Sequence, residues 1–138
     1  SKVYGLAGMR LGYLIARPDI AQRLRQALMA NTNTLAILAA RQALKDTEFY
    51  KFSLAQNEKC KAWIYGELDQ MGLPYLRSHT NFVFFKSGVP IEDLIQKMAA
   101  EDVQIGRPFP PLLEWARIST GTFEEVQAFT RALKKVMA

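Results

Sequence analysis

The sequence has one cysteine, Cys60, so it cannot form an internal disulfide framework. Free thiols are typical of reducing compartments, and we expect a cytoplasmic protein. No apolar run approaches the length that a membrane-spanning helix needs, and the first residues lack the basic-then-apolar pattern of a signal peptide. The composition therefore predicts no association with a membrane.

Concentrated positive charge and metal-ligand spacings are also lacking. Lysine and arginine outnumber aspartate and glutamate by 18 to 13, but they are scattered along the chain. Nucleic-acid-binding proteins usually gather such charge on one face, so we expect an anionic small ligand and no nucleic acid. The one histidine, His79, has no acidic or cysteine partner at a useful spacing, and we interpret it as a turn residue with no metal.

What is present suits a globular domain. The 138 residues are 49% hydrophobic and 22% charged, which is enough to build a core. The first residue is serine and not methionine, from which we expect the natural start of the protein to lie upstream.

The first half of the chain reads as one strand followed by helices. The apolar segment 11–16 predicts a strand that stops at Arg17-Pro18, and no partner for it is evident in the chain. Such an edge would favour self-association. Apolar spacing and capping residues then predict three helices. The first begins at Pro18, the second runs over 35–44 and the third over 48–71.

The second half alternates strands and helices. Strands are predicted over 74–76, 81–85, 103–106 and 115–120, and helices over 91–101 and 122–137. The order predicts an α/β fold, in which a two-layer α+β domain is joined to an N-terminal segment and strand whose sheet lies elsewhere.

The opening run, Ser1-Lys2-Val3-Tyr4-Gly5-Leu6-Ala7-Gly8-Met9-Arg10, carries the clearest chemical signal. A lysine amine that is kept neutral can form a Schiff base with a carbonyl cofactor. Ser1 and Arg10 suit the phosphate of such a cofactor, and the glycines let the backbone pass close to it.

This run resembles the cofactor-lysine segment of fold-type I pyridoxal-phosphate enzymes, and the resemblance is closest to the histidinol-phosphate aminotransferase family. It implies that pyridoxal 5'-phosphate is the cofactor, with Lys2 as the Schiff-base and proton-transfer residue. It also implies that Ser1, Lys2 and Arg10 bind the cofactor.

A second cluster follows the last predicted strand. Arg117 stands ahead of Gly121-Thr122 and a helix, as does the substrate-carboxylate arginine of these aminotransferases, and a planar guanidinium suits a carboxylate. Arg107 resembles an upstream arginine that helps to hold the substrate phosphate. Here Gly106 precedes that arginine and a proline-rich loop follows it, which departs from the family pattern.

The resemblance implies the carboxy-terminal portion of an aminotransferase that acts on an amino acid, histidinol phosphate or a related substrate, and a 2-oxo acid. Residues 1–30 would contain the cofactor-lysine segment, the last strand of the large domain and the first helix. Residues 31–138 would form the small domain. The ring-stacking aromatic and the acidic partner of the pyridine nitrogen would come from the large domain. We therefore expect the full-length enzyme to be a homodimer and this chain alone to be inactive.

Two other interpretations remain open. The chain could be a free-standing α/β module that binds a partner without catalysis, in which case it would fold stably and ignore pyridoxal phosphate. A basic nucleic-acid-binding protein would lose affinity steeply with salt, but no stacking platform supports that reading.

Overall fold

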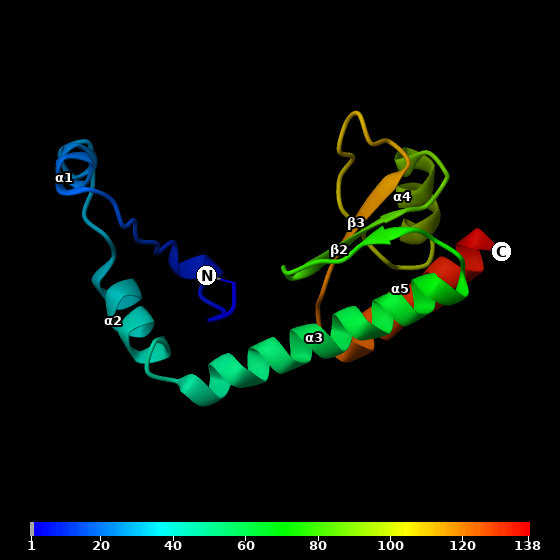
Figure 1. The fold of residues 1–138 in the computed structure, drawn as a ribbon, viewed down its shortest axis with the longest axis horizontal. Helices are drawn as coiled ribbons and strands as arrows, with labels where there is room; N and C mark the ends of the chain where they lie inside the picture. The colour runs from blue at the N-terminus through cyan, green and yellow to red at the C-terminus, as the bar shows by residue number, and fades with distance from the viewer. Residues whose placement is uncertain (1) are drawn as a thin grey trace. The chain divides into compact units, whose positions relative to one another are not determined.

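The computed structural model describes residues 2–138 (Figure 1). The chain forms two compact units: unit 1 ends at Leu54, and unit 2 comprises Ala55–Ala138. The long helix α3, Thr47–Gln70, begins in unit 1 and ends in unit 2.

Unit 1 contains the short 3-10 helix η1 and the helices α1 and α2, with bounds Ala7–Met9, Pro18–Gln26 and Thr34–Ala43. The capping residues act as the sequence predicts. The Asn33 Oδ1 atom accepts hydrogen bonds from the first amides of α2, and Asp46 Oδ1 accepts one from the Phe49 amide at 2.9 Å. The three predicted helices of this half are confirmed.

Residues 11–16, predicted to form a strand whose sheet lies elsewhere, have no regular secondary structure in this chain. A strand requires a hydrogen-bonded neighbour, and none of the described residues pairs with this segment. Tyr13 and Ile15 consequently expose 87% and 88% of their surface.

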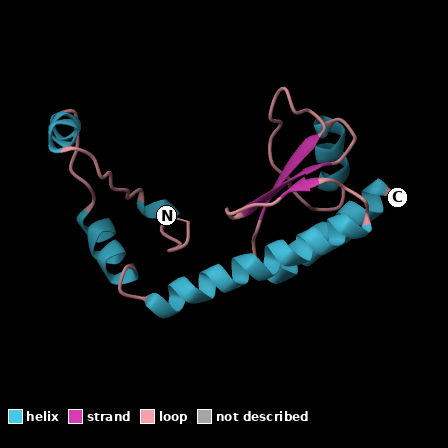
Figure 2. Ribbon diagram, viewed as in Figure 1, coloured by secondary structure: helices cyan, strands magenta, loops and turns pink. Residues whose placement is uncertain are grey.

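Unit 2 contains a three-stranded antiparallel sheet in the order β1-β2-β3 (Figure 2). The strands are Tyr75–Leu76, Phe82–Lys86 and Trp115–Ser119, and the register places Phe84 opposite Arg117. Two helices complete the unit, α4 over Ile91–Ala99 and α5 over Phe123–Met137.

The strand predicted over 103–106 is wrong. This segment makes a single described backbone hydrogen bond to β3, from the Gly106 amide to the Arg117 carbonyl at 3.0 Å. One bond is too few to make a ladder, so the segment runs beside β3 as an irregular connection.

The core of unit 2 lies between one face of the sheet and the helices α3, α4 and α5. Alternate residues of β2 and β3 point into it, and the helices contribute one apolar stripe each. The largest fully buried side chains include Phe85, Ile64, Leu68, Leu94, Met98 and Leu133. This arrangement confirms the predicted two-layer fold.

The other face of the sheet carries alternate residues of β2 and β3, among them Phe82, Phe84, Trp115 and Arg117, which are half-buried. After β3 the chain turns at Gly121 and enters α5 through a capping box. The Glu125 amide donates to Thr122 Oγ1 at 3.2 Å, and the Thr122 amide donates to Glu125 Oε2 at 2.7 Å. The helix predicted over 122–137 is confirmed.

Candidate functional site

The predicted cofactor lysine lies at the start of unit 1. Lys2 is exposed, and its carbonyl accepts a hydrogen bond from the Gly5 amide at 3.0 Å. Gly5 has a φ of 64°, a left-handed conformation that glycine adopts without strain. The turn therefore depends on this glycine. Ser1 lies outside the described residues.

Arg10 follows η1 and lines a pocket of about 390 Å³, whose other polar lining residues are Asn31, Thr32 and Asn33. Its guanidinium donates a hydrogen bond to the Ala7 carbonyl at 3.0 Å. Among residues 2–138 no salt bridge includes Arg10. A cation without an acidic partner, beside amide and hydroxyl groups, suits the phosphate of a cofactor.

Arg117 projects from β3 on the sheet face that is not covered by the helices. Its Cζ atom lies 5.4 Å from the centroid of the Phe82 ring and 4.9 Å from that of Phe109. Within the described part of the chain it makes no salt bridge. The guanidinium is thus oriented by aromatic rings and keeps its hydrogen-bond donors for a ligand.

Arg107 contacts the same ring from the irregular segment before β3. Its Cζ atom lies 4.5 Å from the Phe109 centroid, and its guanidinium donates to the Pro108 carbonyl at 3.2 Å. The side chain is exposed. The structure therefore brings together the two predicted substrate arginines, although they are ten positions apart in the sequence.

The ring that both arginines contact was not predicted from the sequence. Phe109 meets Phe84 edge-on at 5.8 Å, and Phe84 stacks on Trp115 at 5.1 Å. The only sequence signal is the aromatic residue itself, two positions after Arg107, and its role emerges when the loop returns to β3.

Gly106 explains how the segment before Arg107 comes so close to the backbone of Arg117. A Cβ atom at this position would lie 2.8 Å from the Arg117 carbonyl oxygen, nearer than two such atoms normally approach. The glycine that departs from the family pattern therefore permits a tight contact with β3.

A polar cluster ties the ends of β2 and β3 to α3. The Asn57 side chain donates to the Thr80 carbonyl at 3.1 Å and accepts from Thr120 Oγ1 at 2.8 Å. The buried Lys61 donates to the Ser78 carbonyl at 2.8 Å and pairs with Glu58 at 2.7 Å. These residues stabilise the turn before Phe82, and helical spacing alone does not distinguish them from solvated positions.

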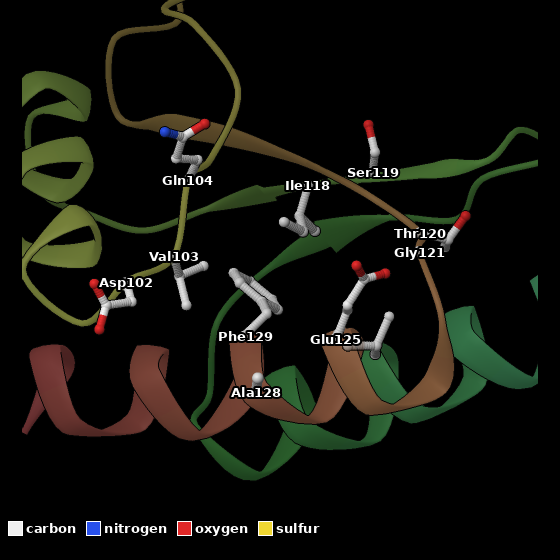
Figure 3. A pocket seen from close by; sticks show the side chains of 11 residues that line it. Asp102, Val103, Gln104, Ile118, Ser119, Thr120, Gly121, Glu125, Ala128 and Phe129 are labelled. Atoms are coloured by element: carbon white, nitrogen blue, oxygen red, sulfur yellow. The ribbon is translucent and has the colours of Figure 1, made fainter.

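The hollow in Figure 3 is lined by residues of β3, of α5 and of the segment 102–104, and its apolar lining includes Ile118 and Phe129. Glu125 and Asp102 stand at its rim, and Glu125 already accepts the amide of the capping box. None of the predicted site residues lines this hollow.

Three further observations concern residues 2–138. These residues contain no group of three His, Cys, Asp or Glu side chains placed to hold a metal ion. The helices they form are too short or too polar to cross a bilayer. Cys60 is buried, and burial raises the pKa of its thiol.

Comparison with known proteins identifies the family of the chain. Residues 1–133 match the family model of class I and II aminotransferases, so the chain belongs to that family. Among individual relatives it is 34% identical to the histidinol-phosphate aminotransferase of Symbiobacterium thermophilum and 39% identical to histidinol-phosphate aminotransferase 1 of Dechloromonas aromatica. Each alignment covers 99% of this chain and 38% of the relative.

Solved structures agree with this assignment. The histidinol-phosphate aminotransferase of Sinorhizobium meliloti, in complex with pyridoxal-5'-phosphate, superposes with a TM-score of 0.87 at 28% identity, over 99% of this chain and 39% of that one. The enzyme from Clostridium acetobutylicum gives 0.87 at 29% identity, over 96% and 42%. The chain thus spans about two fifths of the length of the relatives that it matches, and its fold is part of a fold-type I aminotransferase.

Proposed function

We propose that this chain supplies the cofactor lysine and the substrate-binding arginines of a pyridoxal-phosphate-dependent aminotransferase. The full-length enzyme would transfer an amino group between an amino acid, histidinol phosphate or a related compound, and a 2-oxo acid. The observation that carries the proposal is the pair Arg107 and Arg117, which meet on one ring and have no salt-bridge partner among the described residues. Such a pair suits an anionic substrate.

Each residue then has one task. Lys2 would bind the cofactor covalently through Nζ and afterwards move a proton at the substrate Cα. Ser1 and Arg10 would hold the cofactor phosphate, and Arg117 would fix the substrate carboxylate with two parallel hydrogen bonds. When bound, pyridoxal phosphate supplies an electron sink for the bonds at Cα.

The family relationship and the charge pattern support the other parts of the proposal. The full-length enzyme would be a cytoplasmic homodimer, and residues 1–30 and 31–138 would belong to its large and small domains. The remaining cofactor contacts would come from the part of the relatives that this chain does not match. We therefore expect no appreciable transaminase activity from the 138-residue chain alone.

The test is a chimaera in which the unmatched, amino-terminal part of the Symbiobacterium thermophilum relative precedes residues 1–138. We expect pyridoxal phosphate to be fixed at Lys2 after borohydride reduction, and amino transfer from histidinol phosphate to a 2-oxo acid. Lys2→Ala should abolish both, whereas Lys45→Ala, on an exposed residue of unit 1, should change neither.

A folded chimaera that binds no cofactor at Lys2 would contradict the proposal. Stable folding of the 138-residue chain, together with failure of that chimaera, would instead favour the non-catalytic binding module. The observation that supports this second candidate is that the core of unit 2 consists of residues of that unit alone.

A further inference from the structure

Two positively charged side chains of unit 2 converge on a single aromatic ring. The Cζ atoms of Arg107 and Arg117 lie 4.5 Å and 4.9 Å from the Phe109 centroid. Like charges repel each other, and among residues 2–138 no carboxylate forms a salt bridge with either arginine. The electron-rich face of the ring offers the attraction that such a pair needs.

We propose that Phe109 is a positioning residue that makes Arg107 and Arg117 act as one clamp for an oxyanion. Because both guanidinium groups contact the same ring, their Cζ atoms cannot be farther apart than the sum of the two distances. In such a clamp one oxyanion would contact both guanidinium groups. The inference rests on the proposed function in so far as the ligand there is the anionic substrate.

The ring itself is held by the sheet. Phe84 lies at 81° to the Phe109 ring, and the Phe84 ring stacks on Trp115 at 29°. Phe84 and Trp115 belong to the paired strands β2 and β3, so the sheet register determines where the plane of Phe109 lies. Because the proline-rich loop around Phe109 is irregular, these ring contacts are what fix its position.

Gly106 sets the approach of the loop to β3. Its amide donates to the Arg117 carbonyl at 3.0 Å, and a Cβ atom would lie 2.8 Å from the same oxygen. The residue before Arg107 is thus tied directly to the backbone of Arg117. The hydrogen bond from Gly106 and the contacts with the Phe109 ring involve residues on either side of Arg107. Together they restrict both arginines.

Arg77 provides a contrast within the same unit. Its Cζ atom lies 4.8 Å from the Tyr65 ring and 5.8 Å from the Tyr75 ring, so here one cation contacts two rings. No second cation shares these rings among the described residues. Arg77 is therefore the matched control for an arginine that contacts aromatic rings without forming a clamp.

The experiment follows the Nε–Hε resonances of Arg107, Arg117 and Arg77 in the 138-residue chain while inorganic phosphate is added. Chloride keeps the ionic strength constant. We expect Arg107 and Arg117 to shift along one common isotherm, with resonances displaced by the Phe109 ring current, and Arg77 to remain unaffected.

Phe109→Leu keeps the apolar bulk and removes the ring. It should remove the part of the ring-current displacement that Phe109 causes at both arginines, while the part that Phe82 causes at Arg117 remains. It should also weaken phosphate binding by about two- to fivefold, the factor expected for one exposed cation–π contact. Phe109→Tyr keeps the ring and should restore the wild-type isotherm. Methyl resonances of Leu94 and Leu133 in the core verify that each variant is folded.

Separate isotherms for the two arginines, or a Phe109→Leu variant that keeps both the displacement and the affinity, would overturn the proposal. Neither result depends on the cofactor. If the clamp binds phosphate but the chimaera fails to fix pyridoxal phosphate, the proposed function falls and the positioning role of Phe109 stands. The converse result removes the positioning role alone.

Discussion

Replacement of Gly106 by alanine tests how closely the loop before Arg107 must approach β3. The new Cβ atom would lie 2.8 Å from the Arg117 carbonyl oxygen and 3.4 Å from the Arg117 Cβ. Because the nearest atom belongs to the backbone, rotation of a side chain cannot relieve the contact. The φ of Gly106 lies outside the left-handed region, so alanine adds no backbone strain at the residue itself.

The magnitude follows from the two ways in which the chain can respond. A loop that stays in place suffers overpacking, which costs about 1–3 kcal/mol. A loop that moves away loses the hydrogen bond from the Gly106 amide to Arg117, which costs about 0.5–1.5 kcal/mol. The chain takes the less costly response, so the free energy of unfolding of unit 2 should fall by roughly 0.5–1.5 kcal/mol if the loop moves and by up to about 3 kcal/mol if it cannot.

Urea unfolding measured by tryptophan fluorescence suits this question, because Trp63 and Trp115 both belong to unit 2. Gly66→Ala is the matched control. No atom lies within 4 Å of a Cβ at Gly66, which is inside α3, so alanine there should stabilise the helix by about 0.5–1 kcal/mol. An unchanged free energy for Gly106→Ala, with an unchanged phosphate isotherm at Arg107, would refute the close approach.

Four further outcomes are expected. Thr122→Ala removes the capping-box hydroxyl and should cost about 0.5–2 kcal/mol in urea unfolding, whereas Thr122→Ser should retain most of the stability. Leu133→Ala opens a cavity in the core and should cost about 2–5 kcal/mol by the same assay. Burial raises the pKa of the Cys60 thiol above its ordinary value of 9.0. The protonated thiol therefore contributes fully to the free energy of unfolding below pH 9.0, and this contribution is lost as the pH rises through the raised pKa. Cys60→Ala should remove this loss of stability at alkaline pH. Amides of α1 should exchange with solvent far faster than those of α5, because α1 has no buried residue, and equal protection would show that unit 1 is stable in the chain alone.

The helices were predictable because their signals are local. Asn33, Asp46 and Thr122 are capping residues next to apolar patterns of helical period, and each accepts the expected amide in the structure. The segments 11–16 and 103–106, both predicted as strands, form none in this chain for the opposite reason. A strand exists only with a paired neighbour, and neither segment has a ladder among the described residues.

The site divides in the same way. The resemblance of the segments around Lys2, Arg10, Arg107 and Arg117 to a known family suggested a cofactor and an anionic substrate. The contribution of Phe109 could not be predicted, since it depends on the β2–β3 register and on a loop that returns to the sheet. Side chains that act through tertiary contacts leave no periodic pattern in the sequence.

The candidate residues of unit 1 and those of unit 2 differ in what they require. The core of unit 2 is formed by residues of that unit, and Arg107 and Arg117 contact aromatic rings of the same unit. Unit 1 buries only Ala36 among its described residues, while Met29 and Ile15 expose 102% and 88% of their surface. Because burial of apolar surface is the main stabilising contribution to folding, we infer that the Lys2 and Arg10 region needs further protein to form a site that excludes water. Anion binding and cofactor binding should therefore be separable in this chain, with the first present and the second absent until the missing surface is supplied.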